Sequence, residues 1–145
     1  MRHELVVPDA SVILKWAFNA VPGEKDIDRA DILLHGWLNG KYEIVLPGLW
    51  VFEVANVLGL KIPDLAGEFM DAFMDYRFKT VTMTHDLCRE AFKIMRKYRV
   101  TFYDSIYHAV ALKNSGLLVT ADETYYKKVR AAGSMILLRD FSPEP

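Results

Sequence analysis

Short runs of β-branched and apolar residues alternate along the chain with longer segments of helical periodicity, and this alternation constrains the fold more than any other feature. One or two helical segments separate each short run from the next, which is the length of connection that parallel strands require. The expected strands cover residues 4–8, 42–46, 80–83, 117–120 and 135–138. The sequence therefore predicts an α/β fold in which helices cover both faces of a five-stranded parallel sheet.

Apolar residues at spacings of three and four, together with turn residues, predict the helices. They are expected at residues 11–18, 27–38, 48–60, 63–78, 86–98, 101–113 and 123–131. Pro47 and Pro63 are placed to start helices, Pro8 to end a strand, and Gly116 to cap a helix. At a length of 145 residues, the chain is expected to form one domain over residues 1–145.

Composition narrows the class of protein and its compartment. The net charge of −1 neither requires nor excludes a nucleic-acid partner. Cys88 is the only cysteine, so an internal disulfide and a four-thiolate zinc site are both excluded, and a reducing, cytoplasmic setting is expected. No apolar run approaches the roughly 20 residues that span a bilayer, so no membrane partner is expected.

Four acidic residues stand at positions that suggest chemistry. Asp9 and Asp122 follow expected strands, and ligands of parallel α/β sheets bind beyond the carboxyl ends of the strands. Asp104 lies near the start of the expected helix at 101–113. Glu53 and Asn56 are the only polar side chains between Leu49 and Leu60, so their helix is expected to be mostly buried. A buried carboxylate needs a partner.

The three aspartates, unlike Glu53, also have a purely structural interpretation. Asp9 and Asp122 are placed to cap the helices that follow them, and Asp104 is the third helical residue after a capping Thr101. If the carboxylates converge, two charges about 4 Å apart repel by roughly 4 kcal/mol at an effective dielectric constant of about 20. A bound Mg²⁺ or Mn²⁺ would offset that repulsion, because both ions prefer oxygen ligands. The joint pattern predicts a metal-dependent site for phosphoryl transfer.

Four segments carry a resemblance to a known family. They are VVPDASVILKW with Asp9, LWVFEVANVL with Glu53, TFYDSIYHAVAL with Asp104 and LLVTADETYYKKV with Asp122. In this order, over essentially the whole chain, they resemble the PIN-domain nucleases. Within that family they are similar to the VapC-type toxins of bacterial and archaeal toxin–antitoxin pairs.

The resemblance implies a three-layer α/β/α sandwich, a metal-dependent endoribonuclease activity, a homodimer or higher homo-oligomer, and inhibition by a cognate antitoxin protein. It implies that Asp9, Asp104 and Asp122 bind the metal ion, Mg²⁺ or Mn²⁺. It also implies that Glu53 lies in the same pocket, as a ligand or as a base acting through water. The residues that would orient these carboxylates are Ser11, Asn56 and Thr120, and the hydroxyls among them can equally be local caps.

An RNA backbone needs basic contacts, and two groups of basic side chains are candidates. One group recurs at spacings of three and four along the helix at 86–98, and the other follows Asp122. The residues predicted to contact RNA are Lys127, Lys128, Arg130, Arg89 and Lys93, with Arg96, Lys97 and Arg99 extending the helical group. The alternative for the helical group is a solvated face.

Two further features have competing interpretations. His108 could hydrogen bond Asp104 or a core carbonyl, and a catalytic role is the less favoured interpretation. An apolar stripe is expected to be mainly core, and any exposed part of it could form a dimer seam or a groove for an antitoxin helix. The stripe comprises Trp50, Phe52, Phe69, Met70, Phe73 and Met74.

Other classes of protein fit the sequence less well. A haloacid-dehalogenase phosphatase needs a second aspartate two residues after the first, where this chain has Ser11. A dinucleotide-binding domain and a nucleotide kinase each need a glycine-rich loop that the sequence lacks. The remaining alternative is an interaction module that keeps the fold and the acids but has little or no catalytic activity.

Overall fold

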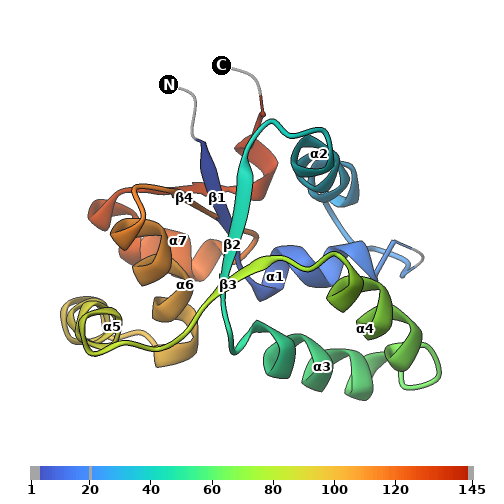
Figure 1. Cartoon of the computed structure of the whole chain (residues 1–145), viewed down its shortest axis with the longest axis horizontal. Coiled ribbons are helices and arrows are strands. Elements are labelled where there is room, and N and C mark those ends of the chain that lie inside the picture. Colours follow the sequence, from blue (N-terminus) through green and yellow to red (C-terminus); the bar gives the residue numbers. More distant parts are fainter. Residues whose placement is uncertain (1–3, 20, 144–145) are drawn as a thin grey trace.

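A five-stranded parallel sheet forms the centre of the protein in a computed structural model, which describes residues 4–19 and 21–143 (Figure 1). The strands are β1 (Leu5–Pro8), β2 (Glu43–Pro47), β3 (Lys79–Val81), β4 (Leu117–Thr120) and β5 (Met135–Leu137). Their order across the sheet is β3-β2-β1-β4-β5, and every neighbouring pair is parallel. The predicted α/β class and five-stranded parallel sheet are confirmed.

Helices lie on both sides of this sheet and complete the three layers. On one side are α1 (Ala10–Ile13), which continues as a 3₁₀ turn at Leu14–Trp16, α2 (Ile27–Leu38), α3 (Trp50–Lys61) and α4 (Ala66–Asp75). On the other side are α5 (His85–Tyr98), α6 (Phe102–Lys113) and α7 (Glu123–Val129) (Figure 1). Short 3₁₀ turns follow α7 at Arg130–Ala132 and β5 at Leu138–Asp140. None of the helices within the described ranges has the length and apolar character needed to cross a membrane.

The strand order reverses between β1 and β4. The chain moves outward from β1 to β2 and β3, and then returns to β4 and β5 on the other flank. Pro8 of β1 pairs with Val119 of β4, so the carboxyl ends of these two strands are adjacent. Such a reversal point is where parallel α/β sheets bind their ligands. Asp9 and Asp122 stand on the two segments that leave it.

One proline behaves differently from the prediction. Pro47 does not start a helix; it is the last residue of β2, where it pairs with Val81, and α3 begins at Trp50. A proline is tolerated at the end of a strand because the ladder loses only one donor there.

The predicted helix at 63–78 is also too long, since α4 covers only Ala66–Asp75. Phe78 leaves the helix and enters the core. Its ring centroid lies 5.8 Å from Trp16, 4.8 Å from Trp37 and 5.8 Å from Trp50. Burial of this aromatic group outweighs the continuing helical pattern.

Helix α3 is not mostly buried, contrary to the prediction. Trp50, Val54 and Leu58 form its core stripe, whereas Phe52 and Leu60 are 78% and 76% exposed. Apolar residues alone could not distinguish a buried helix from one with an uncovered apolar face. The predicted apolar stripe is divided accordingly. Its buried members are Trp50 and Phe73, its partly buried members are Phe69 and Met70, and its exposed members are Phe52 and Met74.

Candidate active site

Asp9 and Asp122 are held at the reversal point by hydrogen bonds between the two strand exits. The backbone N–H of Asp9 donates to the carbonyl of Val119 at 3.1 Å. The hydroxyl of Ser11 donates to Oδ1 of Asp9, and it accepts the backbone N–H of Ala121 at 2.9 Å. Ser11 therefore fixes the Asp9 carboxylate relative to the segment that carries Asp122, as a group that orients the site would do.

The capping roles of these two aspartates are confirmed as well. Oδ1 of Asp9 accepts the N–H of Ser11 at 3.0 Å, and Oδ1 of Asp122 accepts the N–H of Tyr125 at 3.0 Å. A carboxylate has two oxygens and about four lone-pair directions, so one cap does not exhaust it. Capping and ligand binding are therefore compatible at both residues.

Thr120 lies between the same two carboxylates and is fully buried. Its Oγ1 accepts the backbone N–H of Asp122 at 3.0 Å. Together with Ser11, its hydroxyl lowers the pKa of Asp9, which places it against that carboxyl as well. Nevertheless burial is the largest influence, and with the charge of Asp104 it raises the pKa of Asp9 to about 6.

Asp104 reaches this region from the first turn of α6. Thr101 caps that helix, because its hydroxyl oxygen accepts the N–H of Asp104 at 3.2 Å. Burial and then the charge of Asp122 raise the pKa of Asp104, whereas Thr101 lowers it. Asp104 and Asp122 also line one pocket of about 350 Å³. These two carboxylates are therefore neighbours.

Glu53 approaches from α3, on the opposite side of the sheet. Burial raises the pKa of Glu53 to about 7, and the charges of Asp9 and Asp104 add to the rise. Its Oε1 atom and the hydroxyl of Tyr107 are both buried, and neither has a hydrogen-bond partner among the described residues. Tyr107 nevertheless lies close enough to lower the pKa of Glu53. Two orphaned polar atoms therefore face each other at the edge of the site.

We refer to Asp9, Glu53, Asp104 and Asp122 as the acidic cluster. They come from four separate elements, and the mutual electrostatic effects on their pKa values link all four. No ion pair in the described part of the chain includes any of them. The cluster thus concentrates negative charge without a basic partner, which is costly unless a cation or protons offset it.

The oxygen donors of the acidic cluster suit a hydrated divalent ion. Within residues 4–19 and 21–143, no three acidic, histidine or cysteine side chains converge closely enough to hold one ion by themselves. Mg²⁺ usually keeps several waters and binds through one or two carboxylates. Direct contact with some carboxylates and water-mediated contact with the others is the arrangement that these residues fit.

Asn56 is not brought to the cluster. At about 100° per residue, it falls roughly 160° around α3 from the buried Val54, whereas Glu53 falls at the edge of the buried stripe. The side chain of Asn56 is exposed and makes no hydrogen bond with the acidic cluster in the described part of the structure. Spacing by three in sequence does not guarantee a shared direction when one of the two residues sits at the border of the buried stripe.

The basic side chains predicted to contact RNA differ in whether they already form ion pairs. On α5, Arg89 pairs with Asp86 at 3.1 Å and Lys93 with Glu90 at 3.9 Å. Lys127, Lys128 and Arg130 are exposed, and no ion pair among the described residues engages them. The group that follows Asp122 is therefore the more available of the two.

His108 is a structural residue. It is fully buried, its Nε2 donates to the carbonyl of Gly133 at 2.7 Å, and its Nδ1 accepts the hydroxyl of Tyr125 at 2.9 Å. This assignment of donors follows from the carbonyl, which can only accept. Burial lowers the pKa of His108, in keeping with a neutral ring. The hydrogen bond connects α6, which carries Asp104, to α7, which follows Asp122.

Tyr107 is a residue at the site that motif reasoning missed, whereas Arg99 was predicted as an RNA contact without any link to the carboxylates. Tyr107 lies three residues after Asp104 and therefore on a neighbouring part of the same helical face, which was the available signal. Arg99 ends α5 and lines the pocket of Asp104 and Asp122, but in sequence it only extends a basic run. Its position depends on the packing of α5 beside α6, which no local pattern encodes.

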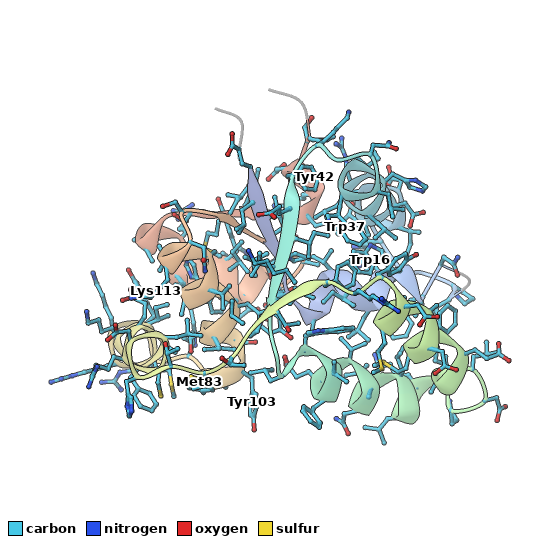
Figure 2. All side chains as sticks on the ribbon, in the orientation of Figure 1. Trp16, Trp37, Tyr42, Met83, Tyr103 and Lys113 are labelled. Atoms are coloured by element: carbon cyan, nitrogen blue, oxygen red, sulfur yellow. The ribbon has the colours of Figure 1, made fainter. Side chains whose placement is uncertain are left out.

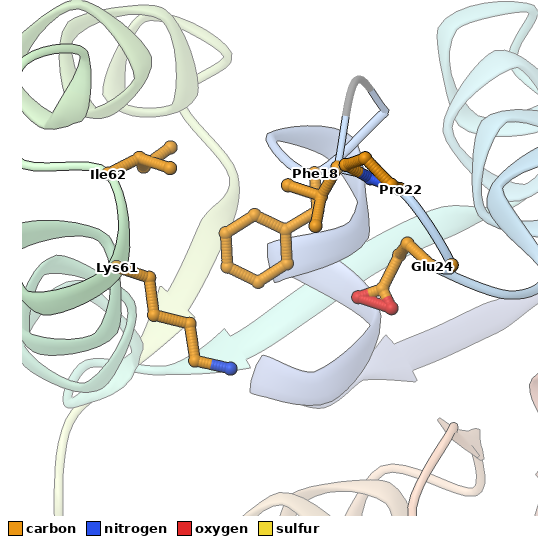
Figure 3. A pocket seen from close by; sticks show the side chains of 7 residues that line it. Phe18, Pro22, Glu24, Lys61 and Ile62 are labelled. Atoms are coloured by element: carbon orange, nitrogen blue, oxygen red, sulfur yellow. The ribbon is translucent and has the colours of Figure 1, made fainter.

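A second pocket, of about 390 Å³, lies between the end of α3 and the loop after the first 3₁₀ turn (Figure 3). Phe18, Pro22, Glu24, Lys61 and Ile62 contribute to its walls, and Lys61 Nζ lies 5.7 Å from the ring centroid of Phe18. None of the acidic cluster lines it. The nearby Lys15 is buried and donates to the carbonyl of Lys25 at 2.7 Å, which identifies it as a structural cation.

Two exposed apolar or aromatic side chains, Tyr103 and Met83, lie on the same side of the molecule (Figure 2). Figure 2 shows Tyr103 and Met83 projecting from the lower side of the molecule, between α5 and α3. Their exposed fractions are 60% and 50%. Tyr103 directly precedes Asp104, so one edge of the candidate site is flanked by an uncovered aromatic ring.

Comparison with known proteins agrees with this architecture. The PIN domain model matches residues 6–131. No curated protein matches the chain. Among solved structures, the chain is similar to a toxin–antitoxin complex from Klebsiella pneumoniae, with 14% identity and a TM-score of 0.63, over 95% of this chain and 97% of that chain.

Two other solved structures share the fold. VapC20 from Mycobacterium tuberculosis, described as a toxin that cleaves the sarcin–ricin loop, has 15% identity and a TM-score of 0.64, over 89% of this chain and 95% of that chain. VapBC2 from Rickettsia felis, bound to a fragment of promoter DNA, has 14% identity and a TM-score of 0.65, over 92% and 96%. At these identities the likeness establishes the fold alone. The family model spans most of the sequence, including all four members of the acidic cluster, and the chain therefore belongs to the PIN domain family of nucleases.

Proposed function

We propose that this protein is an endoribonuclease that hydrolyses RNA phosphodiester bonds with Mg²⁺ or Mn²⁺, and that it is the toxin of a VapBC-type toxin–antitoxin pair. The observation that carries the proposal is the acidic cluster itself. Four carboxylates from four elements gather at the reversal point of the sheet, and none of them has a basic partner among residues 4–19 and 21–143. Such an arrangement is costly for folding and useful for binding a divalent cation.

In this proposal Asp9, Asp104 and Asp122 hold the ion, with Ser11 and Thr120 fixing the directions of the carboxylates. The bound ion supplies a more acidic water and offsets the charge on the phosphate. Glu53 positions the attacking water or accepts its proton. Its pKa of about 7 suits proton transfer near neutral pH.

The RNA strand is proposed to contact the basic side chains that follow Asp122, namely Lys127, Lys128 and Arg130. Arg89 and Lys93 remain weaker candidates because each is paired within α5. Asn56 is exposed and forms no hydrogen bond with the acidic cluster in the described part of the chain, so we do not include it in the mechanism.

The proposed protein partners are a cognate antitoxin and a second copy of this chain, as a homodimer or higher homo-oligomer. Support comes from the toxin–antitoxin complexes among the similar structures and from the exposed Phe52 and Leu60 on α3. The proposed compartment is the cytoplasm, in keeping with the unpaired Cys88 and with an RNA substrate.

The test is cleavage of RNA in the presence of Mg²⁺ and with excess chelator. We expect Asp104→Asn to lower the rate at least about 100-fold, because it removes a direct metal contact rather than an outer group. Asp31→Asn, an exposed aspartate on α2, is the matched control and should leave the rate unchanged. Equal activity of the Asp104 variant and the control would remove the acidic cluster from the mechanism.

A PIN-fold interaction module with little or no catalytic activity is the alternative. It is favoured by one observation, that no three acidic side chains among the described residues meet at a single point. A purified protein that binds RNA or an antitoxin but does not cleave RNA with Mg²⁺ or Mn²⁺ would support this alternative.

A further inference from the structure

A pocket that shares Asp104 and Asp122 with the acidic cluster is lined by acidic and basic residues together. Its volume is about 350 Å³, within the range of ligand pockets. It extends from the C-terminal end of α5 across the start of α6 to the first turns of α7. The lining residues are Arg99, Val100, Thr101, Asp104, Asp122, Thr124, Tyr125 and Lys128.

The two basic residues of this pocket are not neutralised by its two acids. Arg99 and Lys128 are exposed, and neither forms an ion pair in the part of the chain that the structure describes. By contrast, Arg89 and Lys93 on α5 are each paired with a carboxylate of their own helix. Arg99 and Lys128 are therefore available cations that line the same pocket as two of the proposed metal ligands, Asp104 and Asp122.

Hydroxyl groups extend the polar character of the pocket. The oxygen of Thr101 accepts the N–H of Asp104, and its hydroxyl lies against the Asp104 carboxyl, whose pKa it lowers. Thr124 adds a second hydroxyl, on an exposed residue of α7. Two cations and the hydroxyl of Thr124 around one hollow match the acceptor oxygens of a phosphate group.

We propose that this pocket is a subsite for a non-scissile phosphate of the RNA strand, held by Arg99 and Lys128 while the adjoining phosphate lies at the acidic cluster. The inference rests on the proposed function, because it takes the acidic cluster as the place of hydrolysis. It adds that the enzyme reads the charge of a neighbouring linkage. Its substrates are therefore strands with at least one further phosphodiester beside the bond that is cut.

The backbone of Arg99 allows an unusually clean test. Arg99 has φ +56°, in the left-handed region that glycine adopts without strain, so Arg99→Gly removes the cation without opposing the local conformation. Arg77 is also exposed and has φ +55°, but it does not line the pocket. Arg77→Gly is therefore a control matched in residue type, charge and backbone.

Binding is measured by fluorescence anisotropy with a labelled single-stranded RNA of mixed sequence, in Mg²⁺ and over a series of KCl concentrations. All variants carry Asp9→Asn to prevent turnover. We expect Arg99→Gly and Lys128→Gln each to weaken binding about three- to ten-fold, and to reduce the slope of log K against log salt by about 0.7. Arg77→Gly should leave the slope unchanged, and melting temperatures will establish that each variant is folded.

A second measurement locates the phosphate. In proteins with the natural Asp9, cleavage is followed on RNAs in which one linkage at a time is a neutral methylphosphonate. A methylphosphonate at one position next to the cleaved bond should raise KM. This increase in KM should disappear in Arg99→Gly but persist in Arg77→Gly.

The outcomes separate the subsite from the proposed function. If the wild-type protein cleaves RNA but Arg99→Gly and Arg77→Gly have the same salt slope and the same linkage penalties, the subsite is wrong. The proposed nuclease activity is then still supported. Binding that depends on Arg99 but without cleavage would support the pocket and reject hydrolysis. Failure of the wild-type protein to bind RNA at all would overturn both.

Discussion

Asp9 is a buried carboxylate at the proposed metal site, and its burial has a cost for folding. Burial raises its pKa from 3.8 to about 6. Between about pH 4 and pH 6 the native protein therefore holds a proton at Asp9 that the unfolded chain has lost. The contribution of this residue to the free energy of unfolding falls as pH rises through that window, and above it the native state contains a buried, ionised carboxylate.

We expect Asp9→Asn to stabilise the metal-free protein near pH 7.5 by up to about 2 kcal/mol, and to have little effect near pH 4.5, where Asp9 is already neutral. Chemical denaturation with chelator present, at both pH values, measures the difference. A destabilised variant at the higher pH would show that the hydrogen bonds from Ser11 outweigh the buried charge.

At the residue scale, the sequence predicted the members of the site better than their directions. Asp9 and Asp122 could be placed together because each follows a strand and the strands are parallel. Asp104 and Glu53 could be named as candidates, but nothing in the local pattern of α6 or α3 measures their distance from β1. Asn56 was predicted to orient the carboxylates, but its side chain is exposed. A shift of about 60° around a helix separates Glu53, at the border of the core, from Asn56, in solvent.

At the scale of elements, the order of strands and helices was predictable because periodicity is a local property. The residues at which the strands and helices begin and end were less predictable. Pro47 ends β2 instead of starting α3, and Phe78 leaves α4 to join three tryptophan rings, both for reasons that depend on neighbouring strands and helices. Tertiary packing decided these boundaries, and packing is not visible in a window of a few residues.

Two glycines on helices make a matched pair for testing this packing. A Cβ atom at Gly36 of α2 would lie 2.2 Å from the hydroxyl oxygen of Tyr42, which donates to the carbonyl of Leu33 at 2.6 Å. Nothing lies within 4 Å of a Cβ atom built at Gly59 of α3.

We expect Gly36→Ala to destabilise the protein by about 1–3 kcal/mol, since Tyr42 must move and its buried hydrogen bond is lost. Gly59→Ala should leave the free energy of unfolding unchanged or raise it by up to about 1 kcal/mol, because alanine has a higher helix propensity than glycine. Urea denaturation of both variants measures the two effects. Equal destabilisation would mean that α3 is covered at Gly59, as it would be within an oligomer.

At the scale of the whole molecule, the proposed binding of a metal ion by the acidic cluster requires the complete fold. Asp9 and Asp122 follow strands β1 and β4, whereas Glu53 and Asp104 lie on α3 and α6, on opposite sides of the sheet. The unfolded chain therefore has no equivalent site. We expect Mg²⁺ or Mn²⁺ to raise the melting temperature. The rise should be larger near pH 8 than near pH 6, because protons on Asp9 and Glu53 compete with the ion at lower pH.

Calorimetry at the two pH values, with and without the ion, tests this coupling. Asp31→Asn should keep the full rise in melting temperature, whereas Asp104→Asn should lose most of it. A rise that is equal at both pH values, or retained by Asp104→Asn, would place the ion elsewhere on the protein.

The outermost strands of the sheet, β3 and β5, are only three residues long each. An unpaired strand edge is a template onto which another chain can add by backbone hydrogen bonding, and short edges offer few such bonds. The sheet therefore presents little opportunity for fibril-like stacking between copies. The protein can keep an open sheet, with its costly concentration of charge at the centre, without a strong tendency to aggregate through its borders.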